Sequence, residues 1–117
     1  GLVMSRLQLE AGGTVAWSHL SHADFEAACG TAGDVDHLSN ELRSIAGVQA
    51  AALFRETPDG QVRVSLRSRG AVDVAAVAQR FEGGGHRNAS GCRFNGEEGL
   101  RRQVIEEVIR AVRAAPC

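Results

Sequence analysis

The sequence predicts a single α/β (α+β) domain in which helices pack against a mixed β-sheet of about five strands. Three observations indicate this fold class. The chain has 117 residues, which is long enough for one domain with a hydrophobic core. Segments with alternating apolar residues are interspersed with segments that carry apolar residues at helical spacing. The predicted order is ββααββαβα, an arrangement typical of helices layered on a sheet.

The N-terminal part is predicted to be a β-hairpin followed by a helix. Its strands are expected at residues 5–10 and 14–19, joined by a turn that contains two glycines. Ser21 is then a suitable N-cap, and Asp24 stands three residues later, where an acidic side chain completes a capping box. Gly30 is expected to end this helix.

A second helix is predicted to begin near Asp34 and to end at Gly47. Its apolar residues recur every three or four positions and therefore form one stripe along the helix. The residues of this stripe are Val35, Leu38, Leu42 and Ile45.

A second hairpin follows, with strands predicted at residues 48–56 and 61–69 on either side of the turn TPDG. Side chains alternate between the two faces of a strand. One face of the returning strand would therefore carry Val62, Val64 and Leu66. The opposite face would carry Arg63, Ser65, Arg67 and Arg69.

The C-terminal part is predicted to be a helix, a strand and a helix. Asp73 caps the first of these helices, the glycine run Gly83–Gly85 ends it, and a strand follows at 89–94. Asn95 and Glu98 form a capping pair for the last helix. The apolar residues of the two helices are Val74, Val77, Ala78 and Phe81, then Leu100, Val104, Val108 and Val112.

Composition limits the kinds of partner and compartment. The net charge is −1, so any attraction for anions must be local, although all 13 basic residues are arginines, whose planar guanidinium groups suit phosphate. Cys29, Cys92 and Cys117 include no CxxC pair, which argues against a zinc site or a disulfide framework and favours reducing cytoplasm. We expect neither a signal peptide nor a membrane span. The chain begins with Gly1, which indicates a piece of a longer protein; a native start at Met4 is the alternative.

The stretch RFEGGGHRNASGC is the strongest candidate for a binding site. Glycines let a ligand approach the backbone closely, and successive N–H groups in a turn can bind an anion. His86 can donate a hydrogen bond to a phosphate oxygen, and Arg87 can add charge. The alternative is a helix stop followed by a flexible turn, and the composition alone leaves both interpretations open. The spacing fits neither a dinucleotide-binding loop nor a P-loop.

Two further patterns carry charged side chains. Arg67 and Arg69 lie near a strand end, where two guanidinium groups can bind a phosphodiester, but taken alone they are better explained as part of a solvated sheet face. Asp34, Asp36 and His37 could hold a metal ion, but acidic residues also stabilise a helix start, which is the interpretation we favour. The sequence contains no recognisable pair of nucleophile and base, so the residues by themselves indicate binding rather than catalysis.

The segments SLRSRG and VDV, a helix and then GGGHRNASG follow one another in the chain. This combination resembles the C-terminal DHH-associated domain of the DHH-family phosphoesterases. It is most similar to the bacterial oligoribonucleases that also dephosphorylate phosphoadenosine phosphate. The resemblance extends over nearly the whole chain, because SIAGVQAAALFRE and the terminal amphipathic helix also occur in the expected order.

The resemblance implies that residues 1–117 are the substrate-binding domain of a cytoplasmic two-domain enzyme. Its N-terminal catalytic DHH domain, outside this chain, would hold a pair of divalent metal ions, usually Mn²⁺. The ligand would be a short single-stranded nucleic acid or a nucleotide phosphate, and the fragment alone would be inactive. By position, Arg67 would contact the substrate backbone, and Arg69 is a secondary candidate. The residues that would cradle the phosphate and sugar are Gly83, Gly84, Gly85 and His86.

One position departs from the family pattern, and two other functions remain open. Members often carry four glycines before the histidine, whereas Glu82 occupies the first of these positions and would repel phosphate unless it points away. One alternative is an RNA-binding module similar to the C-terminal domain of alanyl-tRNA synthetases. An arginine commonly follows the glycines there, so His86 favours the phosphoesterase. The other alternative is a scaffold or dimerisation domain, and a homodimer is possible in either case.

Overall fold

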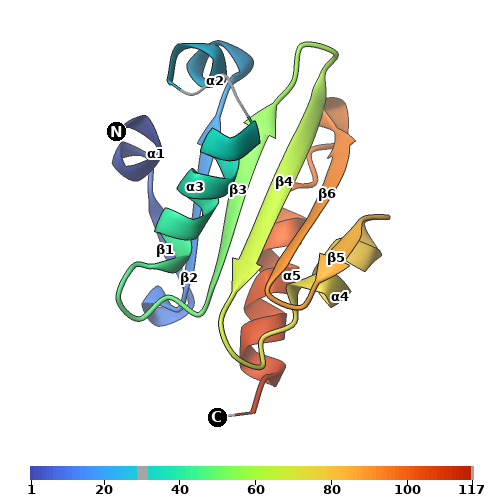
Figure 1. The fold of residues 1–117 in the computed structure, drawn as a ribbon. Helices are drawn as coiled ribbons and strands as arrows, with labels where there is room; N and C mark the ends of the chain where they lie inside the picture. Colours follow the sequence, from blue (N-terminus) through green and yellow to red (C-terminus); the bar gives the residue numbers. More distant parts are fainter. Residues whose placement is uncertain (29–31, 117) are drawn as a thin grey trace.

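A six-stranded mixed sheet forms the middle layer of the computed structural model, which describes residues 1–28 and 32–116. The strands are β1 (Gln8–Glu10), β2 (Val15–Leu20), β3 (Ala50–Glu56), β4 (Gln61–Ser68), β5 (Gly84–His86) and β6 (Ala89–Asn95). They lie in the order β1-β2-β3-β4-β6-β5 (Figure 1). Strands β2 and β3 are parallel, and the other neighbouring strands are antiparallel. The predicted fold class is therefore confirmed, although the sheet has one strand more than expected.

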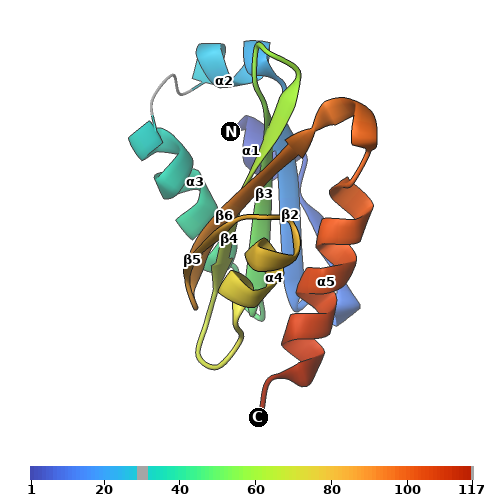
Figure 2. The ribbon, with the colours of Figure 1, turned by 90° about the vertical axis from the view of Figure 1, so that its right-hand side faces the viewer.

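Helices cover both faces of the sheet. They are α1 (Leu2–Ser5), α2 (His22–Ala28), α3 (Ala32–Arg43), α4 (Val74–Arg80) and α5 (Arg101–Ala114), and two 3-10 turns are η1 (Ala11–Gly13) and η2 (Gly96–Glu98). Helices α2 and α3 lie on one side of the sheet and α5 on the other (Figure 2). Within residues 1–28 and 32–116, no helix combines the length and the apolar character that crossing a bilayer requires.

Each face of the sheet has its own hydrophobic core. On the side of α4 and α5, Val64 and Leu66 of β4 are 2% and 0% exposed and pack with the apolar faces of both helices. On the other side, Leu53 of β3 packs with Val35 and Leu42 of α3. Burying each such side chain contributes about 1.5–3 kcal/mol, so two cores can hold three layers together. The predicted alternation in β4 is confirmed.

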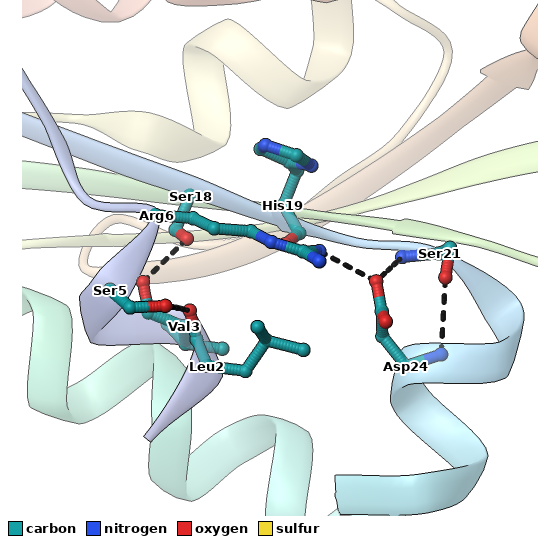
Figure 3. Close-up of polar contacts among 8 residues, drawn as sticks. All are labelled: Leu2, Val3, Ser5, Arg6, Ser18, His19, Ser21 and Asp24. Carbon is teal, nitrogen blue, oxygen red and sulfur yellow. Dashed lines mark hydrogen bonds and ion pairs between the residues drawn. The ribbon is translucent and has the colours of Figure 1, made fainter.

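The N-terminal helix α1 was not expected, and β1 is shorter than the predicted strand. Helix α1 is held against β2 by a buried hydrogen bond in which the Ser18 hydroxyl donates to the Val3 carbonyl at 2.7 Å (Figure 3). Ser18 is fully buried in a strand whose other buried residues are apolar. A buried hydroxyl needs a partner, and the first turn of the chain supplies it.

The start of α2 agrees with the prediction. The Ser21 backbone N–H donates to the Asp24 carboxylate at 3.0 Å, and the Asp24 backbone N–H donates to the Ser21 hydroxyl at 3.1 Å (Figure 3). Arg6 adds an ion pair to the same carboxylate at 2.6 Å. Arg6 and Ser21 together lower the pKa of Asp24 to about 2. This cluster connects the N-terminal segment to α2. The predicted end of α2 at Gly30 lies outside the described residues.

The ends of two other helices differ from the predictions. Helix α3 ends at Arg43 rather than Gly47, and Gly47, with φ of +86°, serves instead in the turn that leads into β3. Asn95 and Glu98 form the expected capping box, but it caps η2. A left-handed residue, Gly99, separates η2 from α5, whose first turn has no side-chain cap. In both cases the turn or cap predicted from the sequence exists, but it belongs to the segment next to the predicted helix end.

Candidate anion-binding face

Two of the predicted site residues lie on the same open face of the sheet. Arg67 on β4 is paired with Ala89 on β6, and Ala89 is paired with His86 on β5. Residues directly opposite each other in neighbouring strands project from the same face, so Arg67 and His86 share one row. With strands about 4.8 Å apart, their Cα atoms are separated by about 10 Å. A shared anion requires this arrangement, because side chains on opposite faces could not reach it.

This is the face that α3 covers in part. In Figure 1, α3 lies over the left half of the sheet, whereas no helix lies in front of β6 and β5. The helices α4 and α5 pack behind these strands. The uncovered area is therefore bounded by α3 on one side and by the edge strand β5 on the other.

Arg67 is held in place by α3. Its guanidinium donates to the Asp36 carboxylate at 3.0 Å, to the Asn40 side-chain oxygen at 3.3 Å and to the Leu66 carbonyl at 3.0 Å. The Arg67 side chain is 12% exposed, whereas that of Asp36 is 68% exposed. These contacts orient the guanidinium before any ligand arrives. A phosphate that binds Arg67 must share it with Asp36 or displace that carboxylate.

Asp36 and its neighbour His37, the other candidate metal ligand, both have protein partners in the structure. His37 pairs with Glu41 one turn along α3 at 2.9 Å. In the part of the chain that the structure describes, no three His, Cys, Asp or Glu side chains are grouped so that they could hold a metal ion. The interpretation as a helix start holds for Asp34, which lies in the first turn of α3, whereas Asp36 and His37 follow in the second turn.

Arg69 has a structural contact. It lies just past β4, and its guanidinium donates twice to the Arg43 carbonyl, at 3.2 and 3.0 Å. Arg43 is the last residue of α3, so Arg69 binds a carbonyl that the end of a helix leaves unpaired. A role for Arg69 in ligand binding would require this pair of hydrogen bonds to break.

Two of the three glycines are required by close packing. A Cβ at Gly83 would lie 2.2 Å from the Gly91 carbonyl oxygen, and a Cβ at Gly85 would lie 2.7 Å from the Ser90 Cα. Gly85 also has φ of +142°, a conformation that other residues rarely adopt. Both glycines let β5 lie directly against β6. Their presence is therefore explained by the fold alone.

Gly84 is different, because the fold gives no reason for a glycine there. A Cβ at this position would meet nothing within 4 Å, and its φ is not positive. Gly84 is paired with Gly91, which is paired with Ser65, so all three lie on the open face. A small residue with free space above it leaves the backbone accessible to a ligand.

The helix before the glycines, α4, ends at Arg80, and Glu82 is the left-handed residue that follows its C-cap. Its φ is +65°, the Glu82 N–H donates to the Gln79 carbonyl at 3.2 Å, and the Gly83 N–H donates to the Ala78 carbonyl at 2.8 Å. These bonds are the Schellman motif, in which a left-handed residue, usually glycine, ends a helix. The sequence predicts that the glycine run ends α4, and this prediction is wrong by one residue. The stop lies one residue earlier, and an exposed glutamate occupies it.

A cavity of about 450 Å³ lies on this face. Its floor includes Ser65, Gly91 and Gly84, and its walls include Arg63 and Glu82. Arg67 and His86 do not line the cavity and belong to the next row of the sheet. The structure thus places the glycines and the cationic pair on one face, in neighbouring rows.

The two halves of the sequence motif are joined by hydrogen bonds. The buried Ser68 hydroxyl donates to the Val72 carbonyl at 2.6 Å, and the Asn88 side-chain amide donates to the Ser68 oxygen at 2.9 Å. The Ser90 hydroxyl donates to the Val74 carbonyl at 2.8 Å. Ser68, Asn88 and Ser90 therefore fix the β5–β6 turn against the end of β4 and the start of α4. These hydrogen bonds connect the segment SLRSRG to the segment GGGHRNASG in the folded structure.

The sequence does not predict the partners of three polar residues in this region, Asp36, Asn40 and Asn88. Asp36 and Asn40 stand one turn apart on α3, a spacing that lets both side chains contact the same group. That group is the Arg67 guanidinium, which is 31 and 27 residues away in the sequence. Asn88 was noticed only as part of the motif. Burial raises the pKa of the Cys92 thiol to about 11, which disfavours its thiolate form.

Comparisons with known proteins agree with the resemblance. A family model described as the DHHA1 domain matches residues 24–114. The chain is 32% identical over 113 residues to the bifunctional oligoribonuclease and PAP phosphatase NrnA of Thermus thermophilus, covering 97% of this chain and 32% of that protein. The Bacillus subtilis protein of the same name is 41% identical over 62 residues, which cover 53% of this chain and 19% of that protein. The chain thus spans a third or less of these curated relatives.

Solved structures also share the fold. An exopolyphosphatase-related protein from Bacteroides fragilis superimposes with a TM-score of 0.77 at 30% identity, covering 92% of this chain and 32% of that one. A pGpG-specific phosphodiesterase, PggH, from Vibrio cholerae gives a TM-score of 0.62 at 12% identity, covering 98% of this chain and 38% of that one. At that identity the second likeness concerns the fold alone.

Proposed function

The chain belongs to the DHHA1 domain family, and from this premise we propose that it is the substrate-binding domain of a two-domain phosphoesterase. Its substrates are short single-stranded oligonucleotides or nucleotide phosphates. The names of the relatives that span its length, oligoribonuclease and PAP phosphatase, support this substrate class. The alignment covers 32% of the Thermus thermophilus protein, which leaves room there for a separate catalytic domain.

The observation that carries the proposal is the row that joins Arg67 to His86 beside the open backbone at Gly84. The Arg67 guanidinium, oriented by α3, binds a phosphate oxygen through charge-assisted hydrogen bonds. The exposed His86 imidazole donates a further hydrogen bond. Strand β5 is at the edge of the sheet, so backbone N–H groups on its outer side have no strand partner and can face the ligand.

Hydrolysis belongs to the other domain in this proposal. The metal pair, Mn²⁺ by the family resemblance, would be held there, since the described residues of this chain offer no group of metal ligands. When bound, such metals activate water and stabilise the departing oxygen. The residues of this chain contribute binding and orientation, and we derive no catalytic step from them.

The direct test is the affinity of the chain for phosphoadenosine phosphate and for a fluorescent, phosphorylated dinucleotide. We expect R67A and H86A each to weaken binding about tenfold, since each removes one charge-assisted or neutral hydrogen bond. The matched control is R113A, which removes an arginine from the last turn of α5 behind the sheet. Equal affinities for all four proteins would contradict the proposal. Tight binding of folded RNA together with indifference to mononucleotides would favour an RNA-binding module instead.

A second test concerns catalysis. The purified chain with Mn²⁺ is expected to hydrolyse none of these ligands. A chimaera in which the chain replaces the matching third of the Thermus thermophilus relative is expected to hydrolyse them, and R67A within it should raise KM. Turnover by the chain alone, retained after repeated purification, would show that the assignment of roles is wrong. An active chimaera that R67A and H86A leave unchanged would favour a scaffold role.

A further inference from the structure

A second row of cations lies on the same face, two residues along the strands from the cavity floor. Arg55 on β3 is paired with Arg63 on β4, and Arg63 is paired with Arg93 on β6. Like charges directly opposite each other in a sheet destabilise it. The row therefore concentrates positive charge on this face.

The arginines of this row differ in their contacts. Arg55 lies over the Phe25 ring, with its guanidinium carbon 4.4 Å from the ring centroid. Arg63 and Arg93 are exposed, and neither forms an ion pair or a side-chain hydrogen bond with any of the residues that the structure describes. Their donors are therefore available to a ligand. Because Arg63 and Arg93 are paired across adjacent strands, their two planar guanidinium groups lie on the same part of the face.

The carboxylates around this row are engaged or lie at its border. Asp36 lines the cavity but pairs with Arg67. Asp59, in the β3–β4 turn, accepts a hydrogen bond from the Thr57 hydroxyl, and that bond, more than the charge of Arg93, lowers its pKa. Glu82 lines the cavity on the side of β5 and forms no ion pair with Arg93 among the described residues. A ligand phosphate at the arginines thus has two charged carboxylates at its border, Asp59 on the side of the turn and Glu82 on the side of β5.

The geometry separates this row from the first one. Arg63 and Arg67 are four residues apart on β4, so their Cα atoms are about 13 Å apart. The cavity floor of Ser65, Gly91 and Gly84 lies between the two rows. An extended chain of phosphates that crosses the cavity floor can therefore place one phosphate at each row. The two rows therefore suit two phosphates of one chain.

We propose that Arg63 and Arg93 form a second phosphate subsite, so that this face binds a chain of linked phosphates across the cavity rather than a single phosphate. The inference deepens the proposed function and rests on it for the first subsite. No aromatic side chain is among the described residues that line the cavity. Contacts inside the cavity are therefore expected to be mainly with phosphates, which carry no base sequence.

The test compares ligands of different length on the full chain. R63Q/R93Q is matched by R110Q/R113Q, which removes the same charge from α5 on the other side of the sheet. For a single-stranded pentanucleotide, R63Q/R93Q should weaken binding about tenfold or more and reduce the slope of log affinity against log salt by about 1.4. Affinity for phosphoadenosine phosphate should stay unchanged, and the control should match the unmodified chain for both ligands.

The outcomes separate the two proposals. If R63Q/R93Q and R110Q/R113Q give the same affinity and salt slope with the pentanucleotide, the second subsite does not exist, even when R67A still weakens both ligands. If the unmodified chain binds neither ligand, the proposed function itself fails. A titration with linear polyphosphate of matched length shows whether the phosphates that bind belong to a nucleic acid or to inorganic polyphosphate. Polyphosphate binding that is tighter than pentanucleotide binding and equally sensitive to R63Q/R93Q keeps the subsite and assigns it to inorganic polyphosphate, whereas weaker polyphosphate binding assigns it to the oligonucleotide.

Discussion

At the scale of single residues, Glu82 combines two unfavourable features at one position. It adopts the left-handed conformation that ends α4, and its carboxylate lines the cavity beside the proposed phosphate subsites. A left-handed conformation costs a non-glycine residue about 1–2 kcal/mol. The sequence showed that a family glycine was replaced, but only the structure shows that this glycine position is a helix stop.

Replacing Glu82 by glycine should therefore improve both properties. We expect E82G to raise the free energy of unfolding by about 1 kcal/mol, measured by urea denaturation, because glycine relieves the strained backbone. Phosphate affinity should also rise, since a negative charge leaves the cavity. E82Q is the matched control: it removes the charge but keeps the strain, so affinity should rise while stability stays constant. An E82G protein no more stable than E82Q would contradict the helix-stop explanation.

The neighbouring glycines allow a second prediction. G83A should destabilise the protein by about 1–3 kcal/mol, because its methyl group overlaps β6. G84A should change stability by no more than about 0.5 kcal/mol, since its methyl group meets nothing. If ligand approaches the backbone there, G84A should nevertheless weaken binding. Thermal unfolding and binding of phosphoadenosine phosphate measured on both variants decide the matter. Unchanged binding by G84A would remove this glycine from the site.

At the scale of elements, the junction between α1, β1 and α2 depends on one carboxylate. Arg6 and Ser21 hold the pKa of Asp24 at about 2, below its ordinary value of 3.8. A group with a lowered pKa in the folded state stabilises the protein at higher pH, and this contribution is lost as pH falls through the folded-state value. The stabilisation by Asp24 is therefore complete above about pH 5 and disappears between about pH 4 and pH 2.

This element-scale argument gives a pH prediction. R6Q should be less stable than the unmodified chain at neutral pH, and the difference should shrink as the pH is lowered from about 4 to about 2. Urea denaturation at a series of pH values measures the difference. R113Q, on an exposed part of α5, is the control for a general loss of positive charge. A difference between R6Q and the unmodified chain that persists undiminished at pH 2 would mean that Arg6 acts through packing rather than through Asp24.

The elements that sequence reasoning missed are those without a pattern of their own. Helix α1 has four residues, too few for periodicity, and it depends on the distant hydroxyl of Ser18. Strand β5 consists of two glycines and a histidine, residues with little preference for strands, and it exists because it pairs with β6. In contrast, β4 and α4 carried strong local signals, and both the alternation in β4 and the cap at Asp73 are confirmed.

At the scale of the whole molecule, the sequence predicted the fold class, the family and the motif, but not how the site is assembled. That Arg67 and His86 share a face depends on the register of three strands, which no local pattern reveals. The hold of α3 on Arg67 joins residues far apart in the chain. Arg93 by itself gives no sequence signal for a binding site, because only the strand register shows that it lies beside Arg63.

The central claim is that the face of β4, β6 and β5 receives a phosphorylated nucleotide. Titration of the isotopically labelled chain with phosphoadenosine phosphate, followed by the amide resonances in nuclear magnetic resonance spectra, tests it most directly. We predict that the largest shifts occur at Gly84 and His86 and at the end of β4 near Arg67, while α5 is unaffected. Shifts confined to α4 and α5, on the other side of the sheet, or no shifts at saturating ligand, would contradict the account.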